Sequence, residues 1–333
     1  MFRAIATSLI AIVTMFAMLA VYLQITLPRK SEAPNINFTL TPEMKERGVY
    51  LAENVLVCDD CHSQRDWGKF GGPIKKPQGA GRGCVTSEVS LTGRLRDENQ
   101  FSGIAINSED YFPEYLCVPN ITPHPTGIGD WTDGELLRAV REGINIDDKA
   151  MFPIMPYHIY RDLTGLDALA VISWMRDLPP VDEVAPPRQV KFPMNVLVNR
   201  WPRPVFAVSK PLNADDEVEY GSYLSHQARC NYCHTPRWGQ TLEDSPNLLM
   251  AGGVSFMIGK YAVRSTNLTP HEDGLKDWSR EAFIRRFKSY EDYDSNAVNT
   301  WMNWKAYSGM TEEDLGAIYA YLQSLRPVPT PGS

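Results

Sequence analysis

Two pentapeptides decide how this chain folds: Cys58-Asp-Asp-Cys61-His62 and Cys230-Asn-Tyr-Cys233-His234. In each, two cysteines stand three positions apart and a histidine follows the second cysteine directly. A lone cysteine pair at this spacing is ambiguous between a redox dithiol and a metal site. The added histidine is typical of covalent c-type haem attachment, in which the thiols add to porphyrin vinyl groups and the histidine becomes the proximal iron ligand.

The presence of two such motifs in one chain argues against a chance match. A zinc site would need a second paired ligand set, and a histidine directly after the second cysteine is not a zinc spacing. We therefore expect two covalently bound haem c groups, with cysteines as attachment points and histidines on the irons. The residues concerned are Cys58, Cys61, His62, Cys230, Cys233 and His234.

Length and charge narrow the class of protein. The chain has 333 residues, of which 43% are hydrophobic, and this is enough for two domains of ordinary size or one large one. The net charge is −7, and no clustering of Lys and Arg predicts a nucleic-acid surface. The mild acidic excess permits, without requiring, a partner with a basic docking face.

The N-terminal segment is apolar. No charged residue stands between Arg3 and Arg29. A run of roughly 25 residues is longer than a signal-peptide core of about 7–15 and long enough to span a bilayer. We expect residues 4–28 to form a retained single-pass transmembrane anchor, with a cleaved signal peptide as the alternative, and residues 31–37 to form a short polar tether. Since c-type haems are attached outside the bacterial cytoplasm, the haem domains are expected on the periplasmic side of the inner membrane.

The chain also contains an internal repeat. Residues 120–131, NITPHPTGIGDW, match residues 267–278, NLTPHEDGLKDW, at an offset of 147. The tails at 169–181 and 316–328 match at the same offset. The haem motifs are 172 residues apart (230 minus 58), so the first half carries 25 extra residues (172 minus 147) between its haem motif and the matching segment.

Apolar residues at helical spacing predict a mainly α fold with little strand. Each half then forms a small helical unit around a haem. The expected helices are 41–55, 133–143 and 166–178 in the first half, and 215–228, 280–290 and 312–325 in the second. The expected divisions are a first domain at 40–181 with an insertion near 66–118, a proline-rich linker at 182–208, and a second domain at 209–328.

The insertion contains the two cysteines outside the haem motifs, Cys84 and Cys117. An oxidising compartment and a leftover pair favour a disulfide between them. The alternative is that one of them is an iron ligand.

The order of these features resembles class I cytochrome c: a helix that enters the haem motif, a loop with a methionine, and a final helix. The Asn-(Ile/Leu)-Thr-Pro segment followed by Met155-Pro-Tyr closely resembles the cytochrome subunits of membrane-bound bacterial alcohol and gluconate dehydrogenases. The resemblance covers roughly residues 40–328. It implies two tandem class I cytochrome c domains behind the N-terminal helix, and a redox partner such as a membrane-bound dehydrogenase, a quinol-oxidising complex or an oxidase.

The sixth ligand of each iron decides between electron transfer and catalysis. A ligand shared by both halves should obey the offset of 147, and Met155 and Met302 do. Met155 lies in the Met-Pro-aromatic loop of the family, whereas Asn303 stands where the second half would have proline. Met151, Met257 and Met310 have no methionine at the matching position. His124 and His271 also obey the offset, so ligation by two histidines is the alternative.

Methionine on both irons predicts an electron carrier, since filled sixth positions leave no room for oxygen or peroxide chemistry. The alternative is a dihaem enzyme, such as a peroxidase or a thiosulfate-oxidising cytochrome, which needs an open, labile or cysteine-ligated iron. Four further matched residues are candidates for hydrogen bonds to the haem propionates, with turn formation and core packing as their alternative roles. These are Asn120, Trp131, Asn267 and Trp278.

Overall fold

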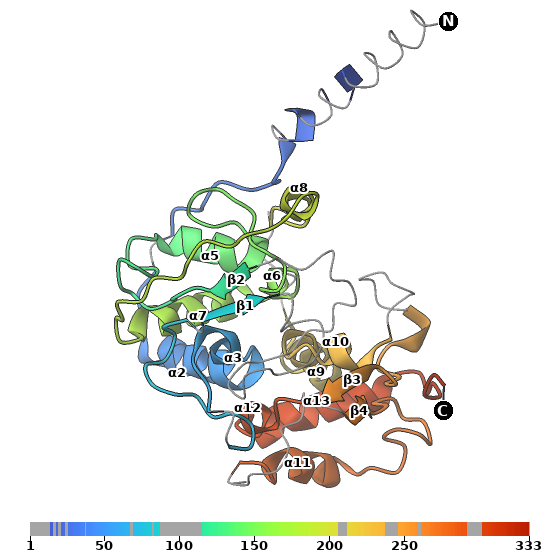
Figure 1. Cartoon of the computed structure of the whole chain (residues 1–333). Coiled ribbons are helices and arrows are strands. Elements are labelled where there is room, and N and C mark those ends of the chain that lie inside the picture. The colour runs from blue at the N-terminus through green and yellow to red at the C-terminus, as the bar shows by residue number, and fades with distance from the viewer. Residues whose placement is uncertain are drawn as a thin grey trace, which may run out of the picture.

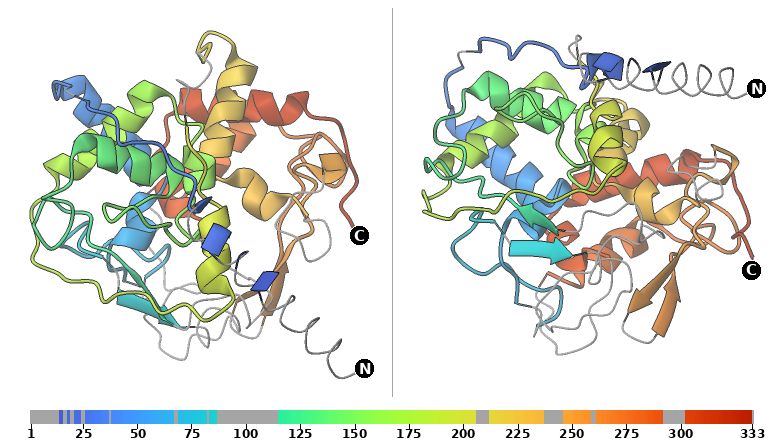
Figure 2. Two further views of the ribbon diagram at one scale, coloured as in Figure 1. Left: turned by 90° about the horizontal axis from the view of Figure 1, so that it is seen from above. Right: turned by 45° about the horizontal axis from the view of Figure 1, so that its top comes forward.

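Helices dominate the structure, as the sequence predicts (Figure 1). This computed structural model describes residues 14–15, 18, 21–23, 26–36, 38–66, 69–81, 83–86, 115–205, 212–236, 246–258, 261–291 and 302–332. Elements of the first half, coloured blue to yellow-green, lie on one side of the molecule, and those of the second half, yellow-orange to red, lie on the other (Figure 2).

The first half contains α2 (Pro42–Tyr50), the π-helical turn η1 (Leu51–Val55), α3 (Cys58–His62), α5 (Asp133–Glu142), α6 (Tyr157–Tyr160) and α7 (Gly165–Asp177). It is followed by α8 (Met194–Leu197) and the 3₁₀ turn η2 (Val198–Arg200). The second half contains α9 (Glu217–Gln227), α10 (Cys230–His234), η3 (Pro246–Leu248), α11 (Arg280–Lys288), α12 (Trp304–Tyr307) and α13 (Glu312–Ser324). The predicted helices are confirmed, each with boundaries within about two residues.

Polar N-caps explain where these helices begin. Thr164 accepts a hydrogen bond from the backbone of Asp167 at the start of α7, and Thr311 accepts one from Asp314 at the start of α13. Thr132 forms a full capping box with Glu135 at the start of α5. Such caps satisfy first-turn N–H groups that the helix itself leaves unpaired.

One close crossing in each half brings the entering helix against the final helix. A Cβ on Gly48 of α2 would lie 2.0 Å from the carbonyl oxygen of Ala170 in α7. A Cβ on Gly221 of α9 would lie 1.8 Å from the carbonyl oxygen of Ala317 in α13. Both distances are too short for any side chain, so glycine sets how closely the two helices approach in each half.

Two short hairpins were not expected from the sequence. Strands β1 (Gly83–Thr86) and β2 (Tyr115–Val118) pair antiparallel, and so do β3 (Ser255–Ile258) and β4 (Tyr261–Arg264). Residues 87–114 connect the first pair, whereas only residues 259–260 connect the second. The extra residues of the first half are therefore inserted between the two strands of a hairpin that both halves share.

The segment expected to be a linker packs onto the first half. Met194 of α8 and Val198 of η2 are buried with Leu116 and Phe152 in a small apolar cluster. Arg188 also donates a hydrogen bond of 2.6 Å to the carbonyl of Ala150. The linker thus covers the chain just before the Met155 loop instead of bridging solvent.

The segment expected to be a tether is also held in place. Ser31 donates through its backbone N–H (3.1 Å) and its hydroxyl (2.6 Å) to the buried carboxylate of Glu142 in α5. Of the apolar segment at 4–28, residues 14–15, 18, 21–23 and 26 are helical, and much of the rest lies outside the described residues. Among the residues that are described, no helix has the length and apolar character needed to cross a membrane.

The two halves share one hydrophobic core and exchange equivalent hydrogen bonds. Tyr50 in α2 donates to the Oδ2 of Asp314 in α13 (2.5 Å), and Tyr223 in α9 donates to the Oδ2 of Asp167 in α7 (2.6 Å). Each residue of one bond has its repeat counterpart in the other. This reciprocal pattern is that of an interface with two-fold symmetry.

Candidate haem sites

Each haem motif folds as a single helical turn. The residue before it, Val57 in the first half and Arg229 in the second, has a left-handed backbone with φ of 51° and 61°. This reversal ends the entering helix and starts α3 or α10 in a new direction. Within each turn the two cysteines and the histidine stand at positions i, i+3 and i+4, which share one face of a helix. The motif therefore presents its thiols and imidazole together.

Both motif histidines are held by equivalent backbone carbonyls. The Nδ1 of His62 lies 3.0 Å from the carbonyl oxygen of Pro119, and the Nδ1 of His234 lies 2.7 Å from that of Thr266. Because a carbonyl can only accept, Nδ1 carries the proton and Nε2 is left with a free lone pair. Protein ligands to metals use this arrangement to orient the ring.

The burial of both rings favours their neutral form. His62 and His234 are each 8% exposed, and burial lowers the pKa of both, against a smaller opposing effect of the carbonyl hydrogen bond. A neutral imidazole with a free Nε2 is the state that binds iron. The histidines of both motifs therefore fit an axial haem ligand.

The carbonyls that hold these histidines belong to the residues directly before the two Asn-X-Thr turns. The amide of Asn120 accepts from the backbone of Thr122 (2.9 Å) and donates to the carbonyl of Val181 (2.8 Å). Asn267 makes the same two hydrogen bonds, with the backbone N–H of Thr269 and the carbonyl of Val328. These bonds give both asparagines the turn-forming role that was the alternative to a propionate contact, and the propionate contact itself stays a prediction.

The matched tryptophans differ from the asparagines. Trp131 packs against the core and Trp278 is 38% exposed, and their carbonyls accept hydrogen bonds from Arg176 and Tyr319. Within the part of the chain that the structure describes, neither indole N–H has a hydrogen-bond partner. Both indoles remain available for the predicted contact with a propionate.

The two candidate methionines lie in equivalent turns. Met155 and Met302 are partly buried and pack against the hydrophobic core. The carbonyl of Met155 accepts from the N–H of Tyr157, and that of Met302 accepts from the N–H of Trp304, both at 2.8 Å. The turn thus keeps its hydrogen bond even though Asn303 replaces the proline of the first half. Iron ligation by these methionines stays a prediction.

The matched histidines of the alternative have a local role. The Nδ1 of His124 accepts from the backbone N–H of Thr126, and that of His271 accepts from the N–H of Asp273, both at 3.2 Å. Each ring therefore organises its own turn.

The cysteines fall into two groups. The cysteines of the haem motifs form no disulfide; these are Cys58, Cys61, Cys230 and Cys233. Burial raises the pKa of Cys58 above its usual range and that of Cys230 to about 11, so neither has the lowered pKa of a reactive redox dithiol. Cys117 is disulfide-bonded, and the backbone of Cys84 lies directly opposite it in the β1–β2 register. This register supports the predicted pairing of Cys84 with Cys117.

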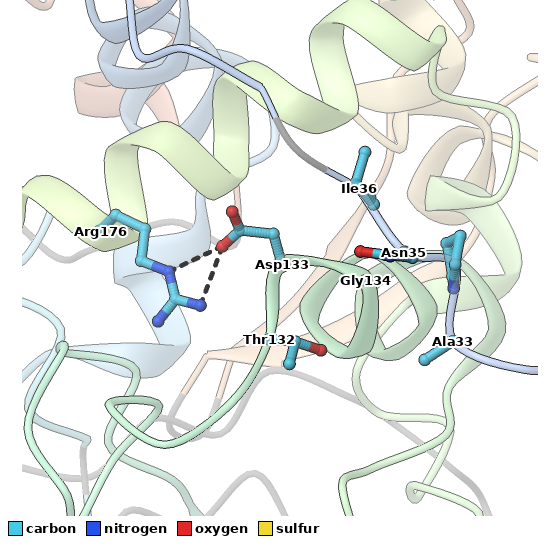
Figure 3. Close-up of a pocket in the computed structure, with 8 residues that line it drawn as sticks. Ala33, Asn35, Ile36, Thr132, Asp133, Gly134 and Arg176 are labelled. Carbon is cyan, nitrogen blue, oxygen red and sulfur yellow. Dashed lines mark hydrogen bonds and ion pairs between the residues drawn. The ribbon is translucent and has the colours of Figure 1, made fainter.

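One pocket of about 470 Å³ lies away from both motifs, between the segment at 33–36 and the start of α5 (Figure 3). Arg176 borders it and is paired with Asp133 at 2.9 Å. The same guanidinium also donates to the carbonyls of Ile128 and Trp131. None of the haem-motif residues lines this pocket, and its charged groups are occupied with each other.

Comparison with known proteins identifies the family. The family model for cytochrome c matches residues 218–326, which include the second haem motif. A dihaem c-type cytochrome of Cereibacter sphaeroides is 32% identical over 216 residues, covering 62% of this chain and 71% of that protein. The chain belongs to the cytochrome c family.

This cytochrome c is also similar to subunits of dehydrogenases. It is 33% identical over 267 residues to the cytochrome c subunit of the quinone-dependent alcohol dehydrogenase of Gluconacetobacter polyoxogenes, covering 74% of this chain and 54% of that subunit. It is 30% identical over 234 residues to the gluconate 2-dehydrogenase cytochrome c subunit of Pantoea cypripedii, covering 62% and 50%. The cytochrome c spans about half the length of these two relatives.

Membership in this family implies covalently bound haem c, and the residues present fit that group. Each motif offers two cysteines outside any disulfide, beside a buried imidazole whose Nδ1 is hydrogen-bonded. Among the described residues, no group of three or more His, Cys, Asp and Glu side chains could hold a bare metal ion.

Proposed function

We propose that this cytochrome c carries electrons through two covalently bound haem c groups, from a dehydrogenase or another respiratory partner to a terminal acceptor. The observation that carries the proposal is the recurrence of the Nδ1–carbonyl bond at His62 and His234. Two sites that prepare their histidines in the same way are best explained by two haems. The dihaem relative supports this number, and the dehydrogenase subunits among the relatives support a dehydrogenase partner.

The residues of the chain have separate tasks in this function. Cys58 and Cys61 hold one haem, Cys230 and Cys233 hold the other, and bound haem supplies the one-electron iron couple. The histidines orient their imidazoles through the carbonyl bonds described above. Met155 and Met302 are proposed as sixth ligands, which raises the reduction potential and excludes oxygen and peroxide from the iron. The protein is then a carrier and not itself an enzyme.

The proposed location of the chain rests on its apolar N-terminal segment. Residues 4–28 are the proposed membrane anchor, or a signal peptide, because the apolar run is long enough to span a bilayer. The haem domains then lie on the periplasmic side of the inner membrane. Purification in mild detergent tests both the location and the partner, because an anchored carrier should co-purify with membranes and with its dehydrogenase.

Ligation is tested by methionine variants of the full haem-loaded chain. Met155→Ala and Met302→Ala should each remove, for one haem, the absorption band that comes from the bond between iron and the methionine sulfur. Each should also raise that haem's oxidised-to-reduced ratio at a fixed ambient potential about tenfold or more, because a thioether ligand favours reduced iron. Met151→Ala is the matched control, since Met151 lies in the same loop and fails the offset. It should leave both bands in place.

Two results would contradict the proposal. A haem assay that finds one haem per chain would remove the dihaem carrier. Unchanged bands in both methionine variants, together with tight peroxide or cyanide binding by the unaltered protein, would favour the dihaem enzyme that was the alternative.

A further inference from the structure

The two halves differ in charge at one equivalent position beside their haem motifs. Val57 precedes Cys58, and Arg229 precedes Cys230, at an offset of 172. Both residues have the same left-handed backbone. Val57 is apolar and 2% exposed, whereas Arg229 brings a permanent positive charge to the corresponding point. The two halves therefore differ by one full charge at this position.

The side chain of Arg229 crosses into the first half. Its Nη2 donates a hydrogen bond of 3.3 Å to the carbonyl of Leu56. The same carbonyl accepts a hydrogen bond of 2.9 Å from the hydroxyl of Tyr160. Leu56 stands two residues before Cys58, so a guanidinium from the second half is attached to the chain that enters the first haem motif.

Among the residues that the structure describes, little neutralises the positive charge of Arg229. Burial raises the pKa values of Tyr160 and Tyr307, so both hydroxyls are neutral near pH 7. Asp60 is the carboxylate whose charge acts on Arg229, but Asp60 is ion-paired with Arg65 at 3.0 Å. Among the described residues, no carboxylate forms an ion pair with Arg229, and its buried Nε has no hydrogen-bond partner. The positive charge of Arg229 therefore acts on the groups around it.

The anchors of both halves lie within reach of this charge. Arg229 directly precedes Cys230 in the chain, and its guanidinium is hydrogen-bonded to Leu56, two residues before Cys58. The guanidinium therefore acts across the boundary between the halves, because its hydrogen bond holds it beside the chain that enters the first motif.

We propose that Arg229 sets the relative reduction potentials of the two haem sites. This inference rests on the proposed function, because it requires a haem at each motif. Oxidised iron carries one more positive charge than reduced iron, so a nearby, partly buried cation favours the reduced state, and low local polarity strengthens the effect. Arg229 raises the potential of the first haem more than that of the second. It is a positioning and tuning residue that does not contact the iron.

The test uses Arg229→Val in the full chain with both haems attached, so that the residue of the first half is placed in the second. Spectroelectrochemical titration follows both midpoint potentials. At a fixed ambient potential, the oxidised-to-reduced ratio of the first haem should rise about three- to tenfold, where tenfold equals about 59 mV for one electron. The second haem should shift less. Arg229→Lys keeps the charge and should retain most of the potential.

Arg285→Val is the matched control, because Arg285 is an exposed arginine of α11 whose removal changes the net charge equally. Solvent screening should leave both potentials unchanged there. If Arg229→Val fails to retain haem, Arg229→Gln gives the same measurement, since it drops the charge and keeps a donor for Leu56.

Three outcomes overturn the inference. Two haems with unaltered potentials in the variants without charge would overturn the role of Arg229 and leave the proposed function standing. An equal shift of the midpoint potentials in Arg285→Val would show that the effect comes from the net charge of the protein and not from the place of Arg229. A single haem per chain would overturn the inference and the proposed function together.

Discussion

Asp59 is a buried carboxyl inside the first haem motif. It is 4% exposed, and its Oδ1 accepts a hydrogen bond of 2.7 Å from the hydroxyl of Ser63. The amide of Gln78 donates to its other oxygen. Burial raises the pKa of Asp59 to about 6, although these two hydrogen bonds oppose the rise. The second motif has asparagine, Asn231, at this position.

This raised pKa predicts a pH-dependent stability. Asp59 starts from about 3.8 in the unfolded chain, so the folded state holds its proton more tightly between about pH 4 and 6. The resulting stabilisation is complete below pH 3.8 and is lost as the pH rises through 6. Relative to Asp59→Asn, the free energy of unfolding of the parent protein should fall by up to about 3 kcal/mol across this window. Urea unfolding of both proteins from pH 4 to 7 measures it, and a constant difference would contradict the prediction.

At the scale of elements, the glycines at the α2–α7 and α9–α13 crossings control how the halves are built. A methyl group at Gly48 or Gly221 would meet backbone carbonyls that cannot move aside without separating the helices. Gly48→Ala and Gly221→Ala should each lower the free energy of unfolding by about 1–3 kcal/mol or more. Gly165→Ala is the control, because Gly165 opens α7 with nothing within 4 Å of the added methyl. Thermal unfolding of the three variants compares them, and equal melting temperatures would rule out the crossing as the cause.

The elements also show what could be predicted from sequence and why. The helices were predictable because their apolar spacing runs over several turns and their Thr, Ser and Asp caps mark the starts. Strands of four residues, such as β1 and β4, are too short to show an alternating pattern. The proline-rich segment at 182–205 lacks a periodic signal, so its packing through Met194 depends on partners far away in the sequence. The offset of 147 located the methionine turns, but no local pattern reveals the reach of Arg229 to Leu56.

At the scale of the whole molecule, the two reciprocal tyrosine bonds predict unequal effects. Asp167 is also held by Arg47 through two bonds of 2.8 and 3.1 Å, whereas Tyr220 occupies the position equivalent to Arg47 beside Asp314. Tyr50→Phe should therefore lower the free energy of unfolding by about 1–3 kcal/mol, because it leaves the buried carboxylate of Asp314 without its strongest donor. Tyr223→Phe should lower the free energy of unfolding by less, since Arg47 still pairs with Asp167. Denaturant titration of both variants tests this order, and an equal or reversed cost would contradict it.

The reciprocal contact between the halves has a consequence for how such a protein can diverge. In a dimer of identical chains, one mutation alters both copies at once, so the two sites stay equal. In a chain that carries both copies after duplication, each copy mutates alone. Val57 and Arg229, or Arg47 and Tyr220, are places where the copies have separated while the contact between them has been kept. Joining two copies in one gene thus permits a lasting difference between two otherwise equivalent sites, and such a difference can give a relay a preferred direction.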